Sequence, residues 1–250
     1  SVNCFREAFG NRCYLDDMGN GVSPSHLGGM TWLSLNSVFF SFKNTTPQAP
    51  GQATQTLAWL RKQMPPNPEG SKAEAPPVVI VTHLPPTWDL FLKTPSWKPE
   101  YIRQFQEIVA NYPGQVFILA GHYHRNHIQA MERAGEPAVI LSGGALATKY
   151  GYHSNWRDLT FRENADGKVS SVSYTIRYPE NDSWNGTYRV VPRHMDDFFN
   201  TLMDSEPLYR RYVQDIFGHS KDALDQAADG KVRDMVRDQF WVHAEAPAAP

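Results

Sequence analysis

Two stretches decide the fold: PVVIVTH at residues 77–83 and QVFILAGHYH at residues 115–124. Each is a short, continuous apolar run that leads directly into histidine. Such runs are typical of strands covered on both faces, as in parallel sheets. Between them, residues 99–112 begin with proline and repeat apolar side chains on one helical face, which predicts an amphipathic helix. The order strand–helix–strand indicates an α/β layered domain.

The rest of the chain extends this pattern. We expect strands at residues 30–40, 126–131, 137–141, 158–163 and 168–178, a helix at 52–63, helices from residue 195 onwards, and irregular structure in the first 28 residues. The predicted fold class is α/β, with a mixed β-sandwich flanked by helices and a C-terminal helical extension. The predicted domain occupies residues 1–190, the extension residues 191–243, and a disordered tail residues 244–250.

Composition excludes several classes of protein. The 250 residues carry 24 basic and 26 acidic side chains, a net charge of −2, which argues against nucleic-acid binding through a basic surface. The apolar runs are far shorter than the roughly 20 residues of a transmembrane helix. With 41% hydrophobic residues, the chain can form a core. We therefore expect a globular protein with no transmembrane segment.

Three of the nine histidines stand where ligands commonly stand. His83 ends the first buried strand, and His122 and His124 follow the second. In open α/β sheets, sites form beyond the carboxyl ends of the strands, so we expect these histidines to converge on one crevice. Imidazole suits Zn, Fe, Mn or Co, and the preceding Gly121 lets the backbone turn. A structural role for His83, with its ring bonded to a carbonyl, is an equally open alternative.

These motifs resemble those of the calcineurin-like metallophosphoesterases, whose second half carries a strand ending in a metal-binding histidine, a helix, and a strand ending in Gly-His-x-His. Within that family the sequence is most similar to acid sphingomyelinase-like phosphodiesterases. The likeness covers roughly residues 28–180 and rests on Leu33-Ser-Leu-Asn36, on Pro50-Gly-Gln followed by Trp59-Leu60, on His83-Leu-Pro-Pro86, and on Ala147-Thr-Lys-Tyr150.

The resemblance implies an incomplete metallophosphoesterase-like fold and hydrolysis of a phosphodiester or phosphomonoester by a metal-activated water. Two divalent metal ions (Zn, Mn or Fe) are implied, with His83 and His122 on one and His124 on the other. Tyr150 resembles a substrate-groove tyrosine. The implied substrate is a small-molecule or lipid phosphoester. The loop at residues 85–98 could form an apolar lip for a lipid or aromatic group through Trp88 and Trp97, or these tryptophans could pack the loop down.

The family's Asp-x-His, Gly-Asp-x-x-Asp and Gly-Asn-His-Asp/Glu motifs do not occur in this sequence. Together with the start at Ser1, this predicts that the chain is the C-terminal half of such a domain, completed by its precursor or by another chain. Two alternatives stay open: an inactive or non-catalytic scaffold with structural histidines, and a mononuclear zinc hydrolase using only these three histidines.

Compartment and thiol chemistry are only weakly indicated. Sequons at Asn44, Asn181 and Asn185 favour a secreted or extracytoplasmic protein. Cys4 and Cys13 are the only cysteines, and they could form a disulfide or remain as two thiols.

Overall fold

The structure, a computed structural model, describes residues 14–27, 29–68, 75–88, 94–146, 152–220, 225 and 230–242. The protein is mixed α/β, with one large mixed sheet and a second, antiparallel sheet. The strands of the large sheet lie in the order β1–β2–β3–β4–β5–β7–β6–β11. Their bounds are β1 Tyr14–Leu15, β2 Gly21–Leu27, β3 Met30–Leu35, β4 Val78–Thr82, β5 Val116–Ala120, β6 His127–Met131, β7 Ala138–Ser142 and β11 Trp241–Val242.

The second sheet has the order β10–β9–β8, with β8 at Trp156–Glu163, β9 at Val169–Arg177 and β10 at Gly186–Val190. The α-helices are α2 (Ala49–Gln63), α3 (Pro99–Asn111), α4 (Met195–Asp204), α5 (Glu206–Ile216) and α7 (Gly230–Phe240), and short 3-10 turns lie at η2 (Ser37–Phe40), η3 (Asp182–Trp184) and η4 (Pro192–His194). No helix among the described residues combines the length and apolar character needed to cross a bilayer.

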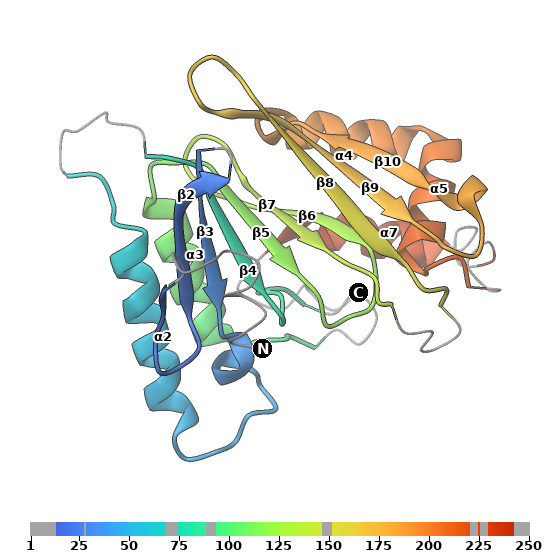
Figure 1. Ribbon diagram of the computed structural model, residues 1–250. Coiled ribbons are helices and arrows are strands. Elements are labelled where there is room, and N and C mark those ends of the chain that lie inside the picture. The colour runs from blue at the N-terminus through green and yellow to red at the C-terminus, as the bar shows by residue number, and fades with distance from the viewer. Residues whose placement is uncertain are drawn as a thin grey trace.

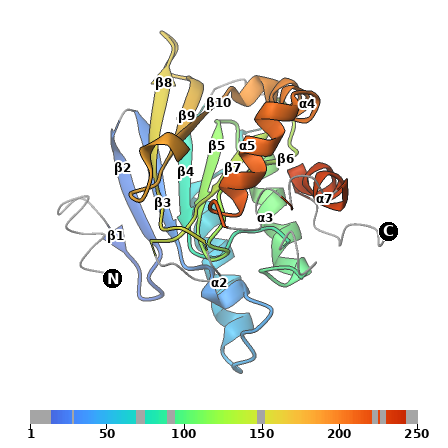
Figure 2. The ribbon, with the colours of Figure 1, turned by 90° about the vertical axis from the view of Figure 1, so that its right-hand side faces the viewer.

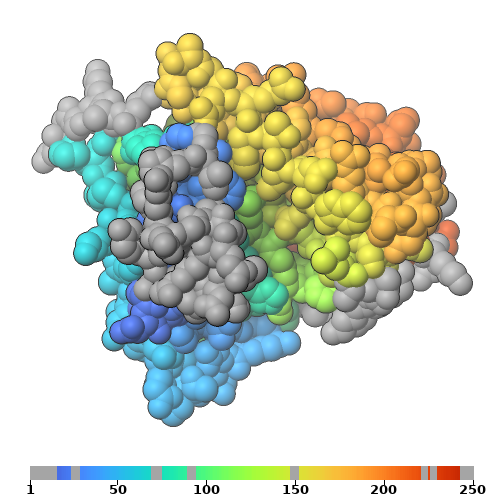
Figure 3. Space-filling model, viewed as in Figure 1, coloured from blue at the N-terminus to red at the C-terminus, as the bar shows by residue number. Residues whose placement is uncertain are grey.

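Three layers build the molecule (Figures 1 and 2). Helices α2 and α3 cover one face of the large sheet. The second sheet covers part of its other face, and α4 and α5 lie beside the second sheet, where the Tyr212 hydroxyl of α5 is hydrogen-bonded to the backbone of Ile128 in β6. In the space-filling view, the second sheet and the helices that follow it occupy one side of the molecule and α2 the opposite side (Figure 3). Each layer buries apolar side chains against the next, which is the main stabilising contribution.

Strands β3, β4, β5 and β7 run parallel, so their carboxyl ends meet at one edge of the sheet. The alternation along β4 and β5 explains why both faces are apolar. Ile80 and Ile118 pair and face the helices, while Val79 and Phe117 pair and face the second sheet. The predicted strands and the predicted helix between them are confirmed to within a residue or two.

Two predictions about local structure were wrong, and one strand was not predicted. Residues 21–27 are not irregular, because they pair with β3 as strand β2. The expected strand at 30–40 ends at Leu35, where the Asn36 side chain accepts a hydrogen bond from Val38 N and begins η2. Strand β10, which pairs along β9, has no clear apolar run and was not predicted. A segment with a weak apolar pattern can still form a strand when it pairs with a neighbouring strand, which its own sequence does not show.

The helices after residue 194 share their apolar core with both sheets. Tyr209, Tyr212 and Val213 of α5 and Val236 of α7 belong to the same buried cluster as Val172 and Tyr174 of β9. The division between residues 1–190 and a helical extension at 191–243 stays a prediction about domain organisation. Residues 244–250, predicted to be a disordered tail, lie outside the described residues.

Trp97 does not form an exposed lip. Its side chain is fully buried, lies 4.3 Å from Phe40 and 5.2 Å from Phe105 between ring centroids, and donates from Nε1 to Leu84 O at 3.0 Å. Trp88, which is half-buried, lies on the same loop. Of the two interpretations of this loop, packing is therefore the one that applies to Trp97.

We predict that Trp97→Ala lowers the free energy of unfolding by about 3–5 kcal/mol, because it empties a fully packed site. The matched control is Trp156→Ala, since Trp156 is 45% exposed and its removal should cost no more than about 0.5 kcal/mol. Urea denaturation of both variants measures the difference. Equal losses in the two variants would contradict the burial of Trp97.

Candidate metal centre

The carboxyl ends of β4 and β5 bring two of the predicted histidines together. His83 directly follows β4, and His122 comes two residues after β5. His83 Nε2 lies 3.3 Å from His122 Nδ1, and the ring centroids are 5.1 Å apart with the ring planes at 79°. Both residues are exposed. The expected meeting of His83 and His122, 39 positions apart in the sequence, is present in the structure.

The backbone around these histidines is tied and sharply turned. Gly121 N donates to His83 O at 3.1 Å, which holds the ends of the two strands together. His122 and His124 both adopt left-handed backbone conformations, with φ of 74° and 59°. A side-chain-bearing residue in this region costs about 1–2 kcal/mol. The surrounding contacts must therefore hold the loop in this shape.

His124 is not joined to the other two in a ready-made cluster. It lies on the same loop and is half-buried. Across the described ranges, no three His, Cys, Asp or Glu side chains come together in a group that could hold a metal ion. The structure thus assembles two of the three predicted ligands, and it leaves the metal role of all three as a prediction.

A positively charged side chain lies at the carboxyl ends of β5 and β7. Arg157 of β8 donates from Nη1 to Leu141 O at 2.9 Å and from Nη2 to Ala120 O at 3.3 Å, at the carboxyl ends of β7 and β5. Gly143 makes room for it, since a Cβ there would lie 2.1 Å from the guanidinium carbon. Sequence analysis did not identify Arg157, because no motif marks a residue of one sheet that bonds to the strand ends of another sheet.

The neighbouring loops close around Tyr123. Its hydroxyl donates to Thr87 O at 3.3 Å and is hydrogen-bonded to Ser96 Oγ. These bonds attach the loop that carries His122 and His124 to the loop that follows β4. Tyr150, the predicted substrate-groove residue, lies outside the described residues, as do Cys4 and Cys13.

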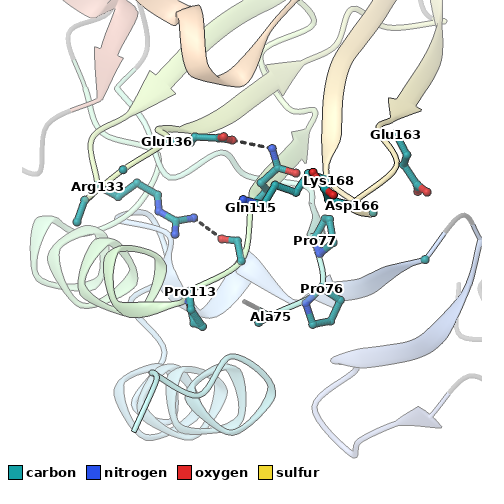
Figure 4. A pocket seen from close by; sticks show the side chains of 15 residues that line it. Ala75, Pro76, Pro77, Pro113, Gln115, Arg133, Glu136, Glu163, Asp166 and Lys168 are labelled. Atoms are coloured by element: carbon teal, nitrogen blue, oxygen red, sulfur yellow. Dashed lines mark hydrogen bonds between the residues drawn. The ribbon is translucent and has the colours of Figure 1, made fainter. Parts of the chain in front are cut away.

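A second cavity, of about 490 Å³, lies at the other end of the sheet, where β4 and β5 begin (Figure 4). Two of its polar side chains are hydrogen-bonded there: Gln115 donates to Glu136 at 2.6 Å, and Arg133 donates to Gly114 O at 2.6 Å. The candidate histidines do not line this cavity, so the histidine site is separate from it.

No protein-family model matches this chain, and no curated protein matches it in sequence.

His127 differs from the three candidate ligands. It begins β6, and burial, followed by the charge of Arg125, lowers the pKa of His127 to about 3. The imidazole is therefore neutral in the folded protein at ordinary pH. Its place inside the sheet gives it a packing role.

We predict that His127 makes the protein less stable as the pH falls. Below about pH 6.5 the unfolded chain binds a proton at His127 that the folded protein does not bind, so this residue subtracts up to about 1.4 kcal/mol of stability per pH unit until the folded pKa is reached. His127→Gln should flatten the decline measured by urea denaturation between pH 7 and 4.5. A His127 ring resonance that titrates near pH 6.5 in the folded protein would contradict this.

Proposed function

We propose that this chain is part of a calcineurin-like metallophosphoesterase, similar to the acid sphingomyelinase-like phosphodiesterases, and that it supplies the histidine ligands of a dinuclear site. The proposed reaction is hydrolysis of a phosphodiester or phosphomonoester. The observation that carries the proposal is the 3.3 Å approach of His83 Nε2 and His122 Nδ1 at the carboxyl ends of neighbouring parallel strands.

The distance between these nitrogens fits a shared cation. Two nitrogens bound at 2.0–2.1 Å to one tetrahedral zinc ion are separated by about 3.3 Å. His83 and His122 would hold one metal, and His124 would contribute to the second. The same distance also suits a hydrogen bond between two imidazoles, which is the interaction expected if the histidines are only structural. Metal binding therefore discriminates between the two interpretations.

Each group in the site has a role in this proposal. A bound metal would lower the pKa of a water molecule and neutralise charge developing on the phosphoryl group. Arg157, at the same edge of the sheet, adds positive charge that favours an anionic phosphoester. Tyr150 would contact the substrate, which we propose to be a small-molecule or lipid phosphoester. The carboxylate ligands would come from a complementary segment, in the same precursor or in another chain.

An extracytoplasmic location fits the exposure of the sequons. Asn44, Asn181 and Asn185 are all partly exposed, and each lies in a turn or loop. Glycosylation needs such accessible positions. We propose this location together with the function.

We predict that the full chain binds Zn²⁺ or Mn²⁺ and that the double variant His122→Ala/His124→Ala loses this binding. The affinity should fall by more than about 100-fold, since loss of a direct ligand exceeds the 10–100-fold effect typical of outer-shell residues. Isothermal titration calorimetry and elemental analysis measure it. His194→Ala is the matched control. His194 is an exposed histidine at the end of η4 that pairs with Asp197 of α4, outside the proposed site.

The same measurements separate the alternatives. A chain without metal, whose thermal stability is unaffected by chelator, would be a scaffold with structural histidines and would refute the proposal. One tightly held metal with metal-dependent hydrolysis of bis(p-nitrophenyl) phosphate by this chain alone would favour the mononuclear hydrolase. Metal binding lost in the double variant, with hydrolysis requiring a second polypeptide, is the expected result.

A further inference from the structure

A buried asparagine, Asn126, ends the loop that carries His122 and His124. Asn126 is 2% exposed and stands just before β6. Its amide nitrogen donates to Asn155 Oδ1 at 2.9 Å and to Asp215 O at 3.2 Å. Its amide oxygen accepts from Gly144 N at 2.8 Å and lies 3.2 Å from the Tyr174 hydroxyl, whose one hydrogen is shared with Ser142 O at 2.7 Å. Both amide hydrogens of Asn126 and its amide oxygen are therefore hydrogen-bonded.

The four partners come from four separate parts of the fold. Gly144 follows β7, Asn155 precedes β8, Tyr174 lies in β9 and Asp215 in α5. Asn126 therefore joins the large sheet, the second sheet and the C-terminal helices at one point. The packing around Asn155 leaves no space for a side chain at residue 144, since a Cβ on Gly144 would lie 2.1 Å from Asn155 Oδ1.

The partner on α5 is itself fixed. The Asp215 carboxylate is buried and accepts hydrogen bonds from Tyr188 at 2.6 Å and from Tyr178 at 3.2 Å. Arg211 and His219 also contact this carboxylate, each at 3.2 Å. Burial, followed by the charge of Asp215, raises the pKa of Tyr188 well above its ordinary value, so Tyr188 remains a donor. The carbonyl that Asn126 contacts thus belongs to a rigid anchor.

Hydrogen bonds hold the loop between β5 and β6 at both of its ends. Gly121, at its start, is bonded to His83, and Asn126, at its end, is bonded to the four partners. The two left-handed residues, His122 and His124, lie between these points. Strained conformations persist only where the surroundings over-determine them.

We propose that Asn126 is a positioning residue, which keeps His122 and His124 in their left-handed conformations and thereby holds the His122 ring against His83. The expected effect on metal binding rests on the proposed function, because the position of the His122 ring would set the affinity for metal. It also gives the C-terminal helices a part in the site, through the bond from Asn126 to Asp215.

The test compares Asn126→Ala with Gln129→Ala in the 250-residue chain. Gln129 is the matched control: a buried amide on β6 whose Nε2 donates to Gln239 O at 2.8 Å, a contact directed to α7 and not to the loop. The first readout uses metal-free protein and follows the through-space NMR contact between the His83 and His122 rings. The second is the affinity for Co²⁺, read from its visible absorption.

We expect Asn126→Ala to lose the ring contact and to bind Co²⁺ about 10–100-fold more weakly, while Gln129→Ala keeps both. Asn155→Ala, which removes one partner of Asn126 and leaves the asparagine in place, should show the same changes to a smaller extent, and it decides the matter if Asn126→Ala does not fold. Retention of the ring contact in a folded Asn126→Ala or, failing that, in Asn155→Ala would overturn the positioning role. A wild-type chain that binds no Co²⁺ would refute the proposed function, and the ring contact would still decide the role of Asn126.

Discussion

The parallel pairing of β4 with β5 is the constraint on which the candidate site depends. Both strands are buried on both faces, and their register joins Val78 to Val116 and Ile80 to Ile118. A slip of one residue would turn every side chain of one strand to the opposite face and break two apolar layers at once. Because the strands begin together and have equal length, their carboxyl ends coincide. The histidines meet as a consequence of core packing.

The site also depends on rigid layers around a strained loop. Two left-handed residues cost about 1–2 kcal/mol each. A buried hydrogen bond contributes about 1 kcal/mol net, so the bonds of Asn126 to Asn155, Asp215 and Gly144 are together comparable to this strain. The bond from Gly121 to His83 adds to them at the other end of the loop. The buried hydrogen bonds of Asn126 can therefore hold an exposed pair of rings in a fixed relation.

The sequence predicted the parts of the fold that local pattern controls. Strands β4 and β5 have continuous apolar runs, and α3 has an apolar face, so their type and approximate ends could be predicted. Strand β2 pairs through its backbone with β3 and lacks such a run, and η2 begins because a single side chain, Asn36, caps it. Of the candidate site, the meeting of His83 and His122 was predicted from strand order. Arg157, Asn126 and Asp215 come from distant segments, and only the three-dimensional packing brings them together.

Charge balance limits what the described part of the chain can hold. Two neutral imidazoles can share one divalent cation, which water and anions can balance at an exposed position. A second cation beside it would add two more positive charges near the Arg157 guanidinium, and the described residues provide no carboxylate cluster to offset them. In metal sites the charge of the ion dominates the local electrostatics. In the proposed dinuclear centre, the second metal would therefore need carboxylates from a complementary segment.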